Sequence, residues 1–145
     1  MRALTSLVFL VASCSRPKSN GTDFTWSGTA PLSVDIDGHH FQATTSLVAN
    51  VSGAIELFGS NSSDTTVTIT FTGVPAVDAI YNTPSPANLG MEIKTTTYDF
   101  FTASSGQVKV LSLVGTAIEG DFYGTVKDSM GVSHTYKNGY FKMTQ

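Results

Sequence analysis

Thr66-Val67-Thr68-Ile69-Thr70-Phe71-Thr72 is the stretch of sequence that decides the fold class. Its apolar and polar residues alternate strictly, and successive side chains of a β-strand point to opposite faces of a sheet. Val67, Ile69 and Phe71 are therefore predicted to face a core, and the four threonines to face water. The stretch predicts a half-buried β-strand.

Similar short strands are predicted on both sides of this stretch. They cover Leu32 to Ile36, His39 to Ala43, Ala54 to Phe58, Met91 to Thr97, Val108 to Val114, Ile118 to Val126 and Ser133 to Met143. Turns are predicted at Asp37-Gly38, Asn50 to Gly53, Gly59 to Asp64, Ser104 to Gly106 and Asp128 to Gly131. Pro75, Pro84 and Pro86 predict a loop between the central strands.

These elements predict one all-β domain over residues 24–145. No stretch has a convincing helical period, and the strands recur at regular spacing. We expect an antiparallel β-sandwich or an up-and-down (lipocalin-like) barrel of about 8–9 strands. Sequence alone leaves the choice between sandwich and closed barrel open.

Composition supports this class and excludes others. The chain has 145 residues, enough for one domain with a sizeable core. Ser and Thr supply 37 residues, only 13% are charged, and the formal net charge is −3. No basic patch is available to neutralise phosphates, so nucleic acid is not an expected partner.

The N-terminus predicts export and lipid attachment. Residues 1–13 hold one positive charge and an apolar run too short to span a bilayer, as in a secretory signal peptide. Val11-Ala12-Ser13-Cys14 matches the lipobox of bacterial lipoproteins, and Cys14 is the only cysteine. The alternative is an ordinary signal peptide followed by a chance cysteine. Residues 14–23 are then a polar tether.

The lipobox predicts a place in the cell envelope. Two or three acyl chains on Cys14, palmitate among them, would hold the mature protein on a membrane leaflet. Ser15 is not the Asp of an inner-membrane retention signal, and no acidic run follows the cysteine. We expect the protein on the periplasmic face of the outer membrane.

The last predicted hairpin has a surface that suits a ligand or partner. Counting residues in twos places Ile118, Gly120, Phe122, Gly124 and Val126 on the core face. The same count, continued through a turn near Met130, gives the outer face a strip of acidic, tyrosine and histidine side chains. The predicted strip is Glu119, Asp121, Tyr123, His134, Tyr136 and Tyr140. Such a strip can stack on sugars or contact a protein, and tyrosines are also common on exposed strands.

Catalytic and metal motifs are not found in the sequence. There is no nucleophile elbow, phosphate loop or zinc-protease motif. His39 and His40 are adjacent, so on a strand they point to opposite faces and do not suit one metal ion. Asp35 and Asp37 are predicted to shape a turn, because the later ligands of a calcium loop are missing. We expect no cofactor, no metal and no catalytic residue.

Several of these segments together resemble a family of small Bacteroidota lipoproteins. The resemblance rests on the lipobox, on residues 34–43 around Asp37-Gly38, and on Ile118-Glu119-Gly120-Asp121-Phe122 with Asn138-Gly139-Tyr140-Phe141. It implies an all-β domain without an assigned activity. It also implies O-glycosylation at Asp-Ser/Thr motifs, here at Thr65 after Asp64 and at Ser129 after Asp128.

The sequence is compatible with three function classes. The favoured one is a lipid-anchored, non-catalytic binding or accessory module, docking on an envelope protein complex. The second is a small-ligand or glycan binder that uses a barrel interior or the tyrosine strip. The third is a hydrolase, for which no motif is present.

Overall fold

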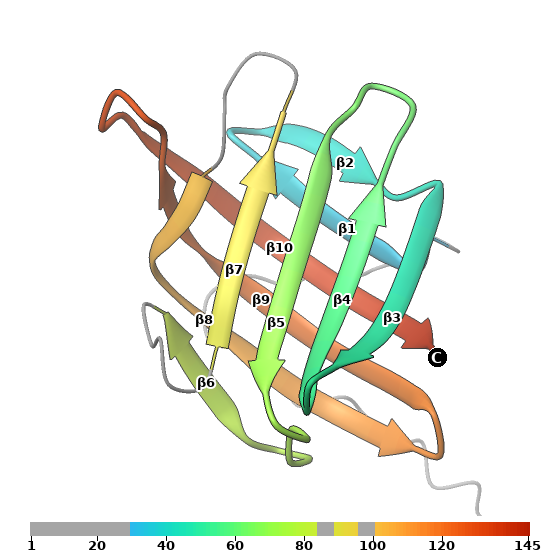
Figure 1. The fold of residues 1–145 in the computed structure, drawn as a ribbon. Helices are drawn as coiled ribbons and strands as arrows, with labels where there is room; N and C mark the ends of the chain where they lie inside the picture. Colours follow the sequence, from blue (N-terminus) through green and yellow to red (C-terminus); the bar gives the residue numbers. More distant parts are fainter. Residues whose placement is uncertain (1–29, 84–88, 96–100) are drawn as a thin grey trace, which may run out of the picture.

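A computed structural model describes residues 30–83, 89–95 and 101–145 of the chain (Figure 1). The predicted signal peptide, Cys14 and the tether lie outside these residues. The strands are β1 (Leu32–Ile36), β2 (His39–Gln42), β3 (Thr45–Val51), β4 (Ala54–Ser60), β5 (Thr66–Thr72), β6 (Ile80–Thr83), β7 (Leu89–Lys94), β8 (Phe101–Val114), β9 (Ala117–Lys127) and β10 (Ser133–Thr144). Within the described ranges, no helix qualifies by length and hydropathy as a membrane span.

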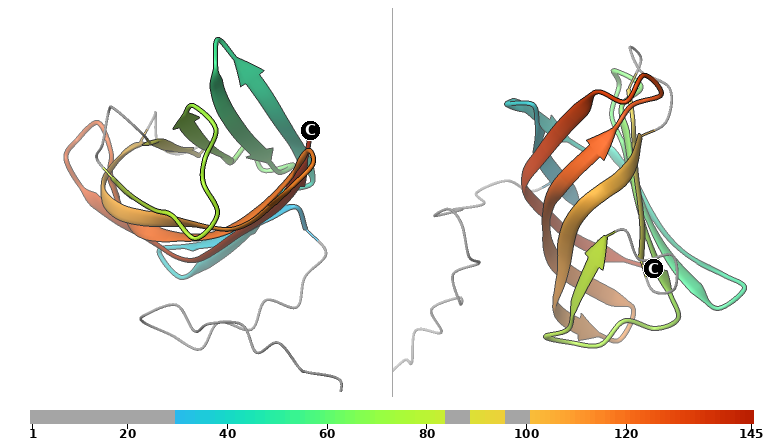
Figure 2. Two further views of the ribbon diagram at one scale, coloured as in Figure 1. Left: turned by 90° about the horizontal axis from the view of Figure 1, so that it is seen from below. Right: turned by 90° about the vertical axis from the view of Figure 1, so that its left-hand side faces the viewer.

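The strands pack as an antiparallel β-sandwich of two layers (Figure 2). One layer holds β2, β1, β10, β9 and β8, with β6 beside β8, and the other holds β7, β5, β4 and β3. The layers join where β7 meets β8 through two residue pairs, Glu92 with Thr102 and Ile93 with Phe101. The sandwich prediction is confirmed, with ten strands rather than eight or nine.

The sheet is not closed into a barrel, so that alternative is wrong. The order of pairing ends at β2 and β3, which do not pair with each other. The chain leaves β2 and enters the other layer at once, where the Thr44 amide donates to the Ser60 carbonyl at 2.8 Å. The chain thus crosses between layers here instead of sealing the sheet.

Two predicted hairpin turns form as the sequence suggests. Asp37 and Gly38 have φ angles of 49° and 81°, the left-handed pair that a two-residue turn requires. Ser52 and Gly53 have similar angles, 52° and 85°, between β3 and β4. Both turns are local consequences of sequence, and both are confirmed.

The core lies between the two layers and confirms the pattern of β5. Val67, Ile69 and Phe71 are each at most 1% exposed. The threonines follow the prediction only in part, because Thr72 is exposed and the other three are half-buried. β5 lies between β4 and β7, whose outward side chains flank those three.

Two predictions for the middle of the chain are wrong. Ser104 to Gly106 is not a turn, because β8 continues through it and only shifts register between Ala103 and Ser105. The Ser104 hydroxyl donates to the Thr125 carbonyl at 3.1 Å, which helps to satisfy the bulged backbone. The second error concerns the loop predicted around Pro75. The chain after this proline forms the strand β6, which pairs with β8. Pro84 and Pro86 lie outside the described residues.

Candidate functional site

The predicted strip on the last hairpin is divided between the two faces of the sheet. In β10, Tyr136 pairs with Gly124, but Gly139 pairs with Phe122, so β10 has one residue more than β9 between these pairs. A one-residue bulge reverses the facing of every side chain beyond it. The prediction of one shared face is therefore wrong for His134 and Tyr136, which lie on the inner side with Val126 and Gly124.

Tyr136 is a core residue. Its side chain is 0% exposed, and its ring lies 6.1 Å from the ring of Phe122. The hydroxyl lies directly over Gly106 and Gly124, where any Cβ would collide with it. Burial raises the pKa of Tyr136 to about 12. The side chain fills space between the layers and is not accessible to a partner.

Tyr140 stays on the outer face but is also buried. It pairs with Asp121 and its side chain is 1% exposed. Its hydroxyl donates to Glu119 Oε1 at 2.6 Å, and Lys142 Nζ lies 3.3 Å from the other oxygen of Glu119. Both Glu119 and Tyr140 are therefore engaged within the protein.

Tyr123 is the exposed aromatic residue of the predicted strip. Its side chain is 43% exposed, and its hydroxyl donates to Gln107 Oε1 at 2.7 Å. The amide of Gln107 donates in turn to Asn82 Oδ1 at 3.0 Å. This row of polar side chains crosses β9, β8 and β6.

A second row lies beside it on the same face. Ile80 pairs with Lys109 and Lys109 pairs with Asp121, across the same three strands. Ile80 is 55% exposed. We call Ile80, Asn82, Gln107, Lys109 and Tyr123 the outer-face patch. It combines an aliphatic and an aromatic side chain with amides and one cation.

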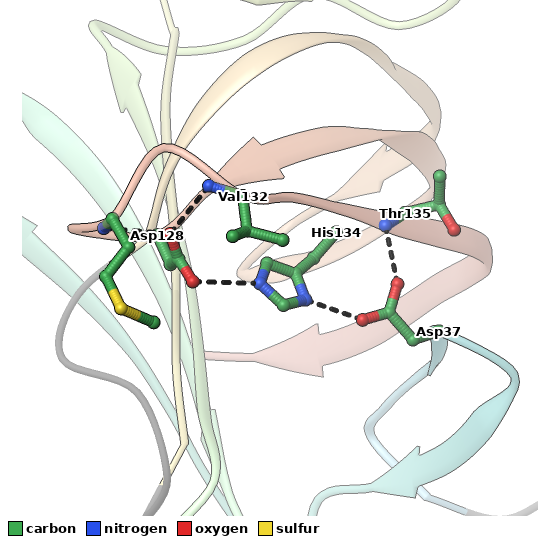
Figure 3. A network of polar contacts seen from close by, with 6 residues as sticks. Asp37, Asp128, Val132, His134 and Thr135 are labelled. Atoms are coloured by element: carbon green, nitrogen blue, oxygen red, sulfur yellow. Dashed lines mark hydrogen bonds and ion pairs between the residues drawn. The ribbon is translucent and has the colours of Figure 1, made fainter.

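A second cluster, at the loop between β9 and β10, surrounds His134 (Figure 3). His134 Nδ1 lies 2.6 Å from Asp37 Oδ2, and Nε2 lies 3.4 Å from Asp128 Oδ2. Asp37 also accepts the Thr135 amide at 2.8 Å. Asp128 accepts the amides of Met130 and Val132 at 2.9 and 2.8 Å.

These contacts set the charge of the cluster. Hydrogen bonding to Asp37, and then to Asp128, raises the pKa of His134 against the opposing effect of burial. The pKa values of both carboxyl groups are lowered by their contacts with His134 and with backbone amides, which outweigh desolvation. The arrangement favours an imidazolium between two carboxylates.

The contacts of His134 connect separate loops of the domain. The imidazole faces a different carboxylate at each nitrogen, and its side chain is 9% exposed. Among the described residues, no group of three or more His, Cys, Asp or Glu side chains converges to hold a metal ion. The cluster fastens the β1–β2 turn to β10 and to the β9–β10 loop.

A third polar contact lies on β1 and β2. Asp35 Oδ1 is 2.6 Å from His40 Nδ1. Asp35 Oδ2 accepts a hydrogen bond from the side-chain Nδ2 of Asn138 at 2.8 Å. Asn138 is the bulge residue of β10, with a φ angle of 54°. Its hydrogen bond, ahead of His40, lowers the pKa of Asp35. His39, which precedes His40 on β2, is exposed.

The two predicted glycosylation residues lie in loops. Thr65 is half-buried, and its amide donates to Asn61 Oδ1 at 3.1 Å. Ser129 is exposed beside Asp128, whose side chain is 2% exposed. Ser129 is thus the more accessible hydroxyl of the two.

Sequence reasoning missed four residues of the outer-face patch and both carboxylates of the His134 cluster. β6 supplies Ile80 and Asn82, and its alternation was obscured by the neighbouring prolines. The sequence identifies Asp37 only as a turn residue, because its contact with His134 spans 97 residues. No family model, curated protein or solved structure matches this chain.

Proposed function

We propose that this protein is a lipid-anchored, non-catalytic binding module of the bacterial envelope, attached through Cys14 to the periplasmic face of the outer membrane. The observation that carries the proposal is the lipobox Val11-Ala12-Ser13-Cys14 with the only cysteine of the chain. The polar tether of residues 14–23 agrees with this attachment, because Ser, Pro, Lys and Gly give it no core-forming pattern.

We further propose that the outer-face patch binds a protein of an envelope complex. Exposed aromatic and aliphatic side chains surrounded by polar groups are typical of protein interfaces. Tyr123 and Ile80 lie on adjacent rows of three paired strands, so their positions are fixed by the sheet. Lys109 and the two amides supply hydrogen bonds that orient a partner.

Lipid attachment is tested by labelling cells with radioactive palmitate. The natural chain should incorporate label and stay with outer membranes. Cys14→Ser should carry no label and be released in soluble form or retained as a precursor. A labelled Cys14→Ser chain, or an unlabelled natural chain, contradicts the proposed anchor.

Partner binding is tested by affinity purification of the lipidated protein from native outer membranes. We expect a stoichiometric protein that is lost with the double variant Ile80→Ser and Tyr123→Ser. Val132→Ser is the matched control, because Val132 is 51% exposed in the β9–β10 loop, outside the patch. Recovery of the same protein with the double variant would remove the patch from the proposal.

Glycan binding by the same patch is the second candidate. Tyr123 beside the amides of Gln107 and Asn82 offers a stacking face and hydrogen-bonding groups. Binding inside a barrel is not retained, because the sheet is not closed. Recovery of the protein alone, together with glycan binding that Tyr123→Ser abolishes, would favour this candidate.

We separately propose O-glycosylation at Thr65 and Ser129, because the family resemblance implies it. Intact-mass measurement of the protein from its native envelope should show hexose-bearing species. Thr65→Ala and Ser129→Ala should remove one glycan each. A single unmodified mass would end this proposal.

A further inference from the structure

The two strands at the ends of the pairing order, β2 and β3, differ in how their free edges are protected. β2 is short, with four residues, and carries His39 and His40. β3 has seven residues, Thr45–Val51, with neither a charged residue nor a proline. Natural edge strands usually avoid pairing with other chains by being short, bulged or charged. β3 uses none of these features.

The hydrogen-bonding groups of β3 alternate between its partner β4 and the free edge. Val51 and Ala54 close a two-residue hairpin, and the closing pair of such a hairpin is hydrogen-bonded. Residues 45, 47 and 49 therefore bond to β4 together with Val51. Ser46, Val48 and Asn50 direct their amide and carbonyl groups outward, and within the described residues no strand pairs with that edge.

The solvent-exposed face of β3, on the side of the sheet away from the core, is apolar. Leu47 is 58% exposed and Val51 is 54% exposed. Leu47 pairs with Phe58 of β4, whose half-buried ring continues the same face. Val48 points the other way and is 7% exposed in the core. An additional strand at this edge would shield Leu47 and Val51 from water.

We propose that β3 pairs antiparallel with β3 of a second copy of this chain, around a two-fold axis at Val48. In this register Ser46 lies opposite Asn50 of the second copy, and Val48 lies opposite its equivalent. Ser46, Val48 and Asn50, whose backbone groups point to the free edge, then all form hydrogen-bonded pairs with the second copy, and each pair exchanges two bonds. On the exposed face Leu47 lies opposite Ala49, and Thr45 lies opposite Val51. The interface is isologous and closed.

The charge pattern leaves β3 as a surface where a second copy meets no local repulsion. The chain has a formal net charge of −3, so contacts between most surfaces of two copies bring like charges together. β3 is uncharged over its whole length, and self-pairing places no charge opposite another. Nothing on this strand selects an oppositely charged partner. The inference is independent of the proposed lipid anchor and outer-face patch.

The edge is also sterically accessible. The β3–β4 hairpin projects away from the layer formed by β8, β9 and β10 in both views of Figure 2. Its turn residues Ser52 and Gly53 are exposed. A second hairpin can therefore approach in the plane of the layer and extend the sheet of β7, β5, β4 and β3 across the axis.

Sedimentation equilibrium of the full chain carrying Cys14→Ser tests the proposal, because this change removes lipid and any disulfide as a cause of association. We expect a reversible dimer. Leu47→Lys should weaken dimerisation by at least about tenfold, because it places two cations at the new interface. The double variant Ser46→Pro and Asn50→Pro should weaken dimerisation to a similar extent. It removes two backbone N–H donors that point to the free edge and leaves the hydrogen bonds between β3 and β4 in place. Val114→Lys is the matched control, because Val114 is 72% exposed in the other layer.

Each outcome decides the proposal. A parent dimer that both β3 variants weaken and Val114→Lys leaves intact supports β3 pairing. A parent chain that remains monomeric at high micromolar concentration overturns it. A dimer of equal strength in all variants also overturns it, because association then uses another surface. Circular dichroism of each variant confirms that loss of the dimer is not loss of the fold.

Discussion

His134 makes the stability of the domain depend on pH. Its ring lies between Asp37 and Asp128, and these contacts raise its pKa above 6.5. A raised pKa in the folded state stabilises the fold when the imidazole is protonated. This contribution is fully present below about pH 6.5 and is lost as pH rises through the folded pKa. The lowered pKa values of the two carboxyl groups act oppositely, with stability lost as pH falls below 3.8.

We therefore expect the free energy of unfolding in urea to be higher at about pH 5.5 than at about pH 8.5. His134→Gln should lower it by about 1–3 kcal/mol at the lower pH, through loss of buried hydrogen bonds. The same variant should reduce the difference between the two pH values. His39→Gln is the control, because His39 is exposed on β2. An unchanged pH difference in His134→Gln would contradict this role of the cluster.

Asp128 acts on the loop that follows it. Its Oδ1 atom accepts the amides of Met130 and Val132, which close the β9–β10 connection. We expect Asp128→Ala to accelerate hydrogen exchange at these two amides while those of β5 stay protected. Ser129→Ala, in the same loop, should leave both rates unchanged. If exchange of Met130 and Val132 were the same in Asp128→Ala, other contacts would have to hold the loop.

At the scale of the strand, close approach of β8, β9 and β10 requires glycine at Gly124. A Cβ at this position would collide with the Tyr136 hydroxyl and the Ser105 carbonyl oxygen. We expect Gly124→Ala to lower the free energy of unfolding by about 3 kcal/mol. Gly90→Ala is the control, because its Cβ would meet only Thr70 Cβ at an ordinary 3.7 Å. Thermal unfolding measures both, and equal stability of the two variants would contradict the close approach.

The strands that sequence predicts well are those whose signals are local. Alternation in β5 and the turn at Asp37-Gly38 depend on neighbouring residues, and both are confirmed. The bulge of β10 depends instead on Asn138, which donates to Asp35 from a strand 103 residues away in sequence. Counting residues in twos cannot detect such a contact. For this reason the face of Tyr123 was predicted correctly and that of Tyr136 was not.

The candidate sites show the same limit. Glu119, Asp121 and Tyr123 share the outer face as predicted, because they alternate along β9, and Tyr140 joins them because it pairs with Asp121 beyond the bulge. Burial of Tyr140 and the contribution of β6 to the patch depend on tertiary packing and pairing. Lipid attachment at Cys14 stays a prediction from sequence, since the residue lies outside the described ranges.

At the scale of the whole molecule, the two layers depend on one core. Among the described residues, strand pairing joins them through two residue pairs between β7 and β8, and side chains packed between the layers do the rest. Ile69 of one layer and Phe141 of the other are both 0% exposed in this core. Neither layer can keep its apolar face buried alone, so the domain should unfold as a single cooperative unit.

We expect Ile69→Ala to lower the free energy of unfolding by about 3 kcal/mol, through lost burial and a residual cavity. Native-state hydrogen exchange should then show the slowest amides of β4 and of β9 losing protection by the same amount, although β4 pairs with β5 and β9 does not. Ile80→Ala is the control for side-chain size, and it should change stability by less than about 0.5 kcal/mol because Ile80 is 55% exposed. If β4 lost protection while β9 kept it, the layers would unfold separately, and the domain would not be a single cooperative unit.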